Sequence, residues 1–201
     1  MVQTPSTMMP IGTKAPDFRL QEPATGKTWA LADFSAPTLL VMFICNHCPF
    51  VVHVRDELTR LAREYAGKGV DVVAINANSA ESHPQDGPEP MAALVRELGW
   101  KFPFLFDETQ EVAKVYHAAC TPDFFVFDQK RALFYRGQLD DSRPSNGKPV
   151  TGADLRAALD AAIAHERAPA DQRPSIGCNI KWKPGNEPDY FTTFISSRKS
   201  G

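Results

Sequence analysis

The stretch that decides the fold runs from Leu39 to Leu61 and reads LLVMFICNHCPFVVHVRDELTRL. Its opening apolar run has the length of a strand and predicts a fully buried β-strand, while the segment from Phe50 spaces its apolar residues like a helix with one buried face. Cys45 and Cys48 form a CxxC pair at the junction, which predicts both thiols at the first turn of that helix. Unpaired backbone N–H groups there favour a thiolate, and the two-residue spacing lets the pair close and reopen a disulfide. The stretch therefore predicts a redox site at a strand-to-helix turn.

Two further segments give this junction a family context. Residues 12–18 (GTKAPDF) precede the strand, and residues 120–124 (CTPDF) place a proline directly before a second apolar strand. With these segments the chain resembles the redoxin branch of the thioredoxin superfamily, which contains thiol–disulfide oxidoreductases and proteins like alkyl hydroperoxide reductase and thiol-specific antioxidant. The resemblance implies an α/β, thioredoxin-like fold with a central mixed sheet flanked by helices, an N-terminal hairpin and a redoxin-type insertion. It also implies that Pro122 lies beside the CxxC pair and follows a cis peptide bond.

The composition fits one substantial globular domain. The chain has 201 residues, of which 43% are hydrophobic, enough for a core of its own. We expect a thioredoxin-like domain over residues 1–167 and a C-terminal tail, residues 168–201, packed on the same domain.

Charge and segment lengths bear on partners and location. The net charge of −2 gives no electrostatic reason to expect nucleic acid or an anionic membrane surface as a partner. Residues 1–10 lack the basic and apolar regions of a signal peptide, and no segment has the length of a membrane span, so we predict a cytoplasmic protein. In that reducing compartment, four cysteines favour catalysis or metal binding over a structural disulfide framework.

The remaining elements are predicted from periodicity and turn residues. We expect a hairpin over residues 18–31, strands over 70–75, 104–106, 124–127 and 133–136, and helices over 91–98, 109–116 and 152–166, with Thr109 and Thr151 as N-caps. The proline- and acid-rich loop 82–90 follows a strand end, where ligands of open α/β sheets tend to bind. It either borders the active site or is a solvated connection.

From Ala168 onward proline, glycine and polar residues dominate, so regular structure is not expected there. Several apolar side chains nevertheless predict that this tail packs back on the domain: Ile176, Cys178, Ile180, Trp182, Tyr190, Phe191 and Phe194. Among these, Ile176, Trp182 and Phe191 should be largely buried, with Cys178 on the same side of the molecule as Cys45.

Roles within the pair follow from thiol chemistry and the family geometry. Cys45 is predicted to attack and Cys48 to resolve, since the first position is the less buried in this geometry. An imidazolium at His47 would stabilise a thiolate and make the site more oxidising. The alternative for Cys45 and Cys48 is that both thiols are buried and inert. The alternative for His47 is that its side chain is exposed and does not affect the thiols.

Several positions depart from the family pattern. Ile44 replaces the usual aromatic residue before the first cysteine, and Leu39 stands where a buried acid is often found. Either another group, such as His53 or Asp123, is therefore expected to assist deprotonation, or turnover is expected to be slow. The peroxiredoxin signature is missing, because Met42 stands three residues before Cys45, which makes peroxidase activity the lesser interpretation.

Two more thiols complete the candidate set. Cys120 precedes Pro122 by two residues and is predicted to be a packing residue, a resolving partner or a metal ligand. Cys178 could reach the CxxC pair from the tail. Together with His47 the four cysteines could bind zinc, although zinc sites of this kind usually have two CxxC pairs.

These observations predict a thiol–disulfide oxidoreductase without an organic cofactor or a metal. Its substrate would be a protein or small-molecule disulfide, and an external reductant of unspecified identity would restore the dithiol. The alternatives are a peroxiredoxin-like peroxidase, a zinc-binding protein and a non-catalytic binding protein with the same fold.

Overall fold

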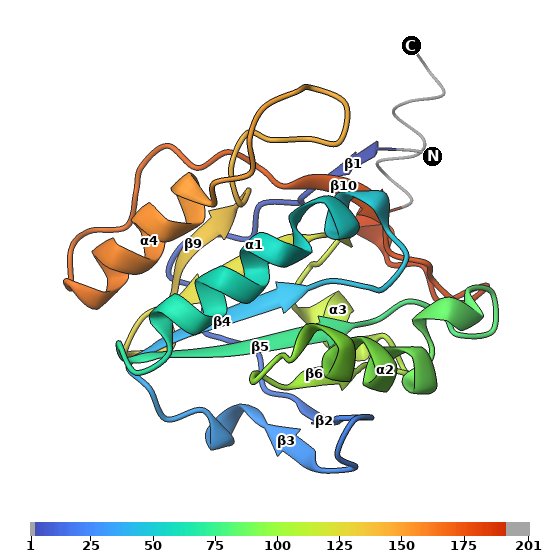
Figure 1. Cartoon of the computed structure of the whole chain (residues 1–201). Helices are drawn as coiled ribbons and strands as arrows, with labels where there is room; N and C mark the ends of the chain where they lie inside the picture. Colours follow the sequence, from blue (N-terminus) through green and yellow to red (C-terminus); the bar gives the residue numbers. More distant parts are fainter. Residues whose placement is uncertain (1–2, 192–201) are drawn as a thin grey trace.

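The computed structural model describes residues 3–191. Its main sheet has seven strands in the order β3-β2-β6-β5-β4-β8-β9 (Figure 1). The two central strands are β4 (Thr38–Phe43) and β5 (Val70–Asn76), which pair in parallel, whereas β8 (Asp123–Phe127) pairs antiparallel to β4. The outer strands are β2 (Arg19–Gln21), β3 (Thr28–Ala30), β6 (Phe104–Phe106) and β9 (Leu133–Gly137). The predicted mixed α/β sheet and N-terminal hairpin are confirmed.

Helices cover both faces of this sheet because side chains of a strand alternate between its faces. Along β4, Leu40 and Met42 belong to one core cluster, which also contains buried residues of α1 (Pro49–Tyr65), α2 (Pro88–Leu98) and α4 (Ala153–Ile163). Leu39, Val41 and Phe43 belong to the other, which contains α3 (Glu111–Val115) and the C-terminal segment. Figure 1 shows α1, α2 and α4 in front of the strands and α3 behind them.

A second, three-stranded sheet joins both ends of the chain to the loop before Pro122. Its order is β1-β10-β7, formed by Gln3–Pro5, Ile176–Asn179 and Cys120–Thr121. The expectation that the tail lacks regular structure is therefore wrong. Strand β10 forms because β1 and β7 offer it antiparallel partners on both sides, which satisfies its backbone groups.

The described part of the tail, residues 168–191, packs on the domain to different depths. Trp182 is buried, whereas Ile176 and Phe191 are half-buried. Phe194 lies outside the described residues. Two aromatic contacts tie this segment together, between Trp182 and Tyr190 and between Trp182 and Phe191.

The predicted N-caps of two helices are displaced by one residue. The N-cap of α3 is Gln110 and that of α4 is Gly152, both in the left-handed region with φ of 67° and 66°. Thr109 and Thr151 instead accept hydrogen bonds from the backbone N–H two residues ahead, at 3.4 and 3.3 Å. Within residues 3–191, no helix combines the length and apolar character needed to cross a membrane.

Candidate active site

The CxxC pair lies between β4 and α1, where the sequence predicts it. Helix α1 starts at Pro49, one residue before the predicted Phe50, with Cys48 as its N-cap, so Cys45 lies in the preceding loop and the expectation that both thiols lie in the first turn is wrong. Proline favours this first helical position because its fixed φ is already helical and its missing N–H would be unpaired there. Cys45 and Cys48 are both reduced, and each has an exposed fraction of 0%. The expectation that Cys45 is the less buried thiol is therefore wrong.

Thr121 contacts both thiols from the loop between β7 and β8. Its hydroxyl oxygen lies 3.4 Å from Cys45 Sγ, and its carbonyl oxygen accepts a hydrogen bond from Cys48 Sγ at 3.2 Å. The Thr121–Pro122 peptide bond is cis, which confirms the prediction. The strand order explains why Thr121 lies beside the two thiols. Because β8 pairs antiparallel with β4, the residues before β8 lie at the carboxyl end of β4, where the CxxC pair follows.

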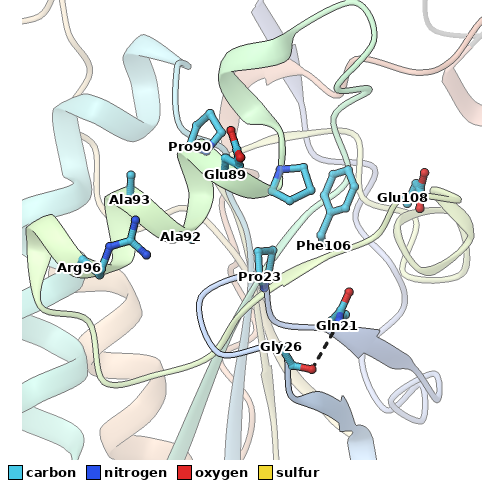
Figure 2. Close-up of a pocket in the computed structure, with 11 residues that line it drawn as sticks. Gln21, Pro23, Gly26, Glu89, Pro90, Ala92, Ala93, Arg96, Phe106 and Glu108 are labelled. Atoms are coloured by element: carbon cyan, nitrogen blue, oxygen red, sulfur yellow. Dashed lines mark hydrogen bonds between the residues drawn. The ribbon is translucent and has the colours of Figure 1, made fainter.

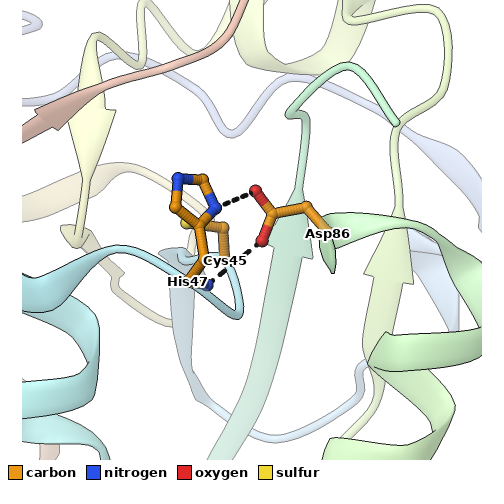
Figure 3. Close-up of side chains that lie close together, drawn as sticks. All are labelled: Cys45, His47 and Asp86. Carbon is orange, nitrogen blue, oxygen red and sulfur yellow. Dashed lines mark hydrogen bonds and ion pairs between the residues drawn. The ribbon is translucent and has the colours of Figure 1, made fainter. Parts of the chain in front are cut away.

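Asp86 anchors the turn between the two cysteines (Figure 3). One carboxylate oxygen accepts hydrogen bonds from the backbone N–H groups of Asn46 and His47, at 2.9 and 3.2 Å. The other accepts from His47 Nδ1 at 2.5 Å and from Asn78 Nδ2 at 2.7 Å. Asp86 itself is fully buried, while the His47 side chain is 25% exposed. The second ring nitrogen of His47 points away from the carboxylate.

The sequence indicates this region without identifying the residue. Asp86 ends the short 3-10 helix η2 (Pro84–Asp86), inside the loop 82–90 for which two interpretations were open. The loop borders the CxxC pair, and the strand-end argument gives the right neighbourhood. Nothing in the sequence distinguishes Asp86 from the acidic residues nearby. Asp86 is buried whereas Glu81 and Glu89 are exposed, and this difference arises only when the chain folds.

Cys178 joins the pair from strand β10. Its Cα pairs with that of Thr121 in the β10–β7 register, and its side chain shares a core cluster with Cys45 and Cys48. The Cys178 thiol is hydrogen-bonded to Cys48. The prediction that Cys178 lies on the same side of the molecule as Cys45 is confirmed.

Hydrogen bonds set the charge distribution among these thiols. Bonds from Cys178 and from Cys45 lower the pKa of Cys48, and they outweigh its burial. The pKa of Cys45 is raised, first by its hydrogen bond to Cys48 and then by burial and the charge of Asp86. Of the three thiols, Cys48 is therefore the one whose deprotonation its neighbours favour, while the pKa values of Cys45 and Cys178 are raised.

The other candidates lie apart from this cluster. The Cys120 thiol contacts the Pro122 carbonyl oxygen at 3.6 Å, and complete burial raises its pKa, which suits a packing residue. His53 Nε2 lies 2.8 Å from the Ser142 hydroxyl. Asp123 pairs with Ser6 and Arg136. No contact links His53 or Asp123 to the CxxC thiols among the described residues.

One group of donors has the composition of a metal site. Cys45, His47 and Asp86 each place one ligand atom within 4.8 Å of the others, and thiolate, imidazole and carboxylate are all zinc ligands. Both Asp86 oxygens, however, already accept two hydrogen bonds each. An ion would have to displace some of these donors, so the geometry favours the metal-free use of the thiols.

A groove of about 790 Å³ lies elsewhere, between the β2–β3 hairpin and α2 (Figure 2). Pro23 and Gly26 line it from the hairpin, and Glu89 and Arg96 from α2. No cysteine or histidine lines it, so its size does not identify the chemistry of the protein.

Comparison with known proteins places the chain in a family. The model of the AhpC/TSA family matches residues 11–136. This chain belongs to the AhpC/TSA family. The match covers the CxxC pair and the cis-proline loop but ends before β10, so Cys178 lies outside it.

Individual AhpC/TSA relatives add detail. The thiol-disulfide oxidoreductase ResA of Bacillus thuringiensis subsp. konkukian is 25% identical over 126 residues, which cover 63% of this chain and 68% of ResA. Other curated ResA relatives are covered over 65% of their length, just under two thirds.

Solved structures match over more of the chain. An uncharacterised conserved protein of Geobacillus kaustophilus is 55% identical with a TM-score of 0.90, covering 92% of this chain and 98% of that one. A thiol:disulfide interchange protein DsbE of Chlorobium tepidum, described as putative, is 19% identical with a TM-score of 0.61, covering 78% and 99%. The latter similarity concerns the thioredoxin-like fold, which is confirmed.

Proposed function

We propose that this protein is a thiol–disulfide oxidoreductase whose redox centre is the Cys45–Cys48 pair. The observation that carries the proposal is the shared hydrogen-bond system of the two thiols, which joins them to each other and to Thr121 beside the cis-proline. The similarity to ResA supports the same reaction class. The absence of the peroxiredoxin signature argues against a peroxidase.

The first step needs a thiolate at Cys45, and the cluster provides a base for it. A Cys48 thiolate lies next to Cys45 and can accept its proton, a transfer that costs free energy because the pKa of Cys45 is the higher of the two. The Thr121 hydroxyl, 3.4 Å from Cys45 Sγ, then donates to the new thiolate and lowers its pKa. This transfer replaces the buried acid that is missing at Leu39.

The exchange then follows thiol–disulfide chemistry. Cys45 thiolate attacks one sulfur of the substrate disulfide, the S–S bond breaks, and one substrate thiolate leaves. Cys48 passes its proton to the substrate thiolate that has left and attacks the Cys45 sulfur of the mixed disulfide, which forms the Cys45–Cys48 bond and releases the second substrate sulfur as a thiolate. An external reductant returns two electrons to the pair, with the proton that restores its starting state.

Substrate and location form the finer part of the proposal. Both thiols are buried, so the attacked disulfide must be a small molecule or an extended, locally opened peptide segment that enters beside Pro122. We also propose a cytoplasmic location, since four free cysteines suit a reducing compartment, which detection in cell fractions would test.

Reduction of insulin disulfides by dithiothreitol tests the proposal. Wild type should accelerate it, Cys45→Ser should abolish the acceleration, and Cys48→Ser should accumulate mixed disulfides with substrate. Cys120→Ser is the matched control, since Cys120 lies outside the cluster. Trapping by Cys45→Ser in place of Cys48→Ser would reverse the two roles.

Two other outcomes would replace the assignment. Consumption of a hydroperoxide without insulin reduction would make the protein a peroxidase. Stoichiometric zinc in protein purified without chelator would make Cys45, His47 and Asp86 a metal site.

A further inference from the structure

Cys178 lies where a third redox thiol can act on the CxxC pair. Strand β10 runs directly beside β7, and at residue 177 the two backbones approach so closely that a Cβ would stand 2.0 Å from the Thr121 carbonyl oxygen. Only glycine fits this contact. The close approach places the next residue, Cys178, on the strand that covers the thiols, with an exposed fraction of 3%.

Cys48 is the thiol that the other two share. It is hydrogen-bonded to both Cys45 and Cys178, all three belong to one core cluster, and its sulfur lies 3.2 Å from the Thr121 carbonyl oxygen. Cys45 in turn contacts the Thr121 hydroxyl. This order, with Cys48 in the centre, means that Cys48 has two sulfur neighbours with which a disulfide can form.

We propose that Cys178 is a second exchange partner of Cys48, so that the oxidised protein converts its Cys45–Cys48 disulfide into a Cys48–Cys178 disulfide. Cys178 attacks Cys48 sulfur, the S–S bond to Cys45 breaks, and the proton of Cys178 passes to the departing Cys45. One disulfide and one thiol are present before and after the step, so no external oxidant or reductant takes part. The inference rests on the proposed function, in which the Cys45–Cys48 disulfide is the product of substrate reduction.

The exchange has a consequence for the reaction. It moves the oxidised bond from the substrate-attacking thiol to the strand that covers the site, and it returns Cys45 to the thiol form. It also links β10 covalently to the N-cap residue of α1, so that β10 is fixed over the redox centre in the oxidised protein.

Cys120 is a matched control on the same small sheet. Its backbone pairs with Asn179, the neighbour of Cys178, and it is equally buried. Its thiol, however, points to the Pro122 carbonyl oxygen at 3.6 Å. If burial or strand position alone decided which thiols are oxidised, Cys120 would be oxidised as well. The proposed exchange predicts that Cys120 stays a thiol.

Disulfide mapping of the full-length Cys45→Ser variant tests the proposal. After oxidation with diamide and alkylation, trypsin yields peptides 28–55, 115–130 and 168–181, which carry Cys48, Cys120 and Cys178 respectively. We expect 28–55 joined to 168–181 as the main disulfide product, unchanged in Cys45→Ser/Cys120→Ser and lost in Cys45→Ser/Cys178→Ser. In oxidised wild type, the same joined pair should coexist with an internal disulfide of 28–55.

The outcomes separate this inference from the proposed function. If Cys45→Ser leaves Cys48 and Cys178 alkylated while wild type forms the internal disulfide of 28–55, the exchange does not occur and the inference is wrong. A joined pair containing 115–130 in place of 168–181 would also overturn it. Failure of insulin reduction, with the 28–55 and 168–181 pair still formed, would refute the proposed function and leave the thiol exchange standing.

Discussion

Asp86 and Asp123 are both fully buried, but Asp86 bonds to the CxxC turn whereas Asp123 has no contact with the CxxC thiols among the described residues. Asp86 lies beneath the CxxC turn, where each oxygen accepts two hydrogen bonds. Asp123 follows the cis-proline, where Oδ1 accepts a hydrogen bond from Ser6 at 2.8 Å. Its Oδ2 has no hydrogen-bond donor among the described residues and lies 4.0 Å from Arg136 Nη2.

The difference shows that an opposite charge nearby does not replace hydrogen bonds to a buried carboxylate. Burial raises the pKa of Asp123 to about 6, although Arg136 and the Ser6 hydroxyl both act to lower it. Arg136 is fully buried as well, and its Nε and Nη1 also lack acceptors within residues 3–191. Asp123 thus favours its neutral form more than a solvated aspartate does, whereas Asp86 needs both oxygens as acceptors.

The isosteric substitution Asp86→Asn should have the largest effect. The amide nitrogen of Asn would replace one carboxylate oxygen, so its N–H groups would face two of the four donors that now bond to Asp86. The CxxC turn would then lose its anchor. We expect insulin reductase activity to fall about 100-fold, the scale of misplacing a reacting group by roughly 1 Å. The free energy of unfolding should fall by about 3 kcal/mol, since hydrogen bonds to a charged group contribute about 1.5–3 kcal/mol each.

Asp123→Asn should stabilise the protein, in contrast to Asp86→Asn. The neutral amide keeps an acceptor for Ser6 and avoids ionisation in a buried site, so the free energy of unfolding at pH 7 should rise, by at most about 3 kcal/mol. Reductase activity should match wild type. Urea unfolding at pH 7 measures the stability; a loss like that of Asp86→Asn would mean that Arg136 requires the ionised partner.

The pH dependence of wild-type stability gives an independent measure. The unfolded chain releases the Asp123 proton near pH 4, whereas the folded protein keeps it up to about pH 6. Between these values the folded state binds more protons, so this group lowers the free energy of unfolding as pH rises from about 4 to about 6. Urea unfolding across this range should give a profile whose Asp123-dependent slope disappears in Asp123→Asn; parallel profiles would exclude Asp123 as its source.

The sequence predicts the fold and the position of the CxxC pair, but not the different roles of these two carboxylates. The apolar run before Cys45, the proline at residue 122 and the apolar strand after it predict the fold and the location of the pair, because burial and turn geometry depend on local residue types. Such patterns do not predict which of Asp86 and Asp123 contacts the CxxC turn. That depends on where the folded chain places each carboxylate and on how many hydrogen-bond donors surround it there.

Strand β10 is missed for a related reason. Its residues, Ile176–Asn179, include a glycine and show no clear alternation, so local propensity argues against a strand. The strand exists because β1 and β7 hydrogen-bond to it from both sides. Long-range pairing overrides local propensity at the element that brings Cys178 to the active site.

Ser6→Ala should have the smallest effect and sharpens the account of Asp123. The Ser6 hydroxyl donates to Asp123 Oδ1 at 2.8 Å and lowers the pKa of that carboxyl, so its removal should raise the pKa further and extend the decline in stability above pH 6. The loss should be about 1 kcal/mol near pH 8 and smaller near pH 4, where Asp123 is neutral. In an Asp123→Asn background the same substitution should give a loss independent of pH, because no group titrates at residue 123. Urea unfolding of the four proteins at both pH values closes this cycle. Equal losses at pH 4 and pH 8 in both backgrounds would show that Ser6 supports packing alone, and that the ionisation of Asp123 does not depend on its one hydroxyl donor.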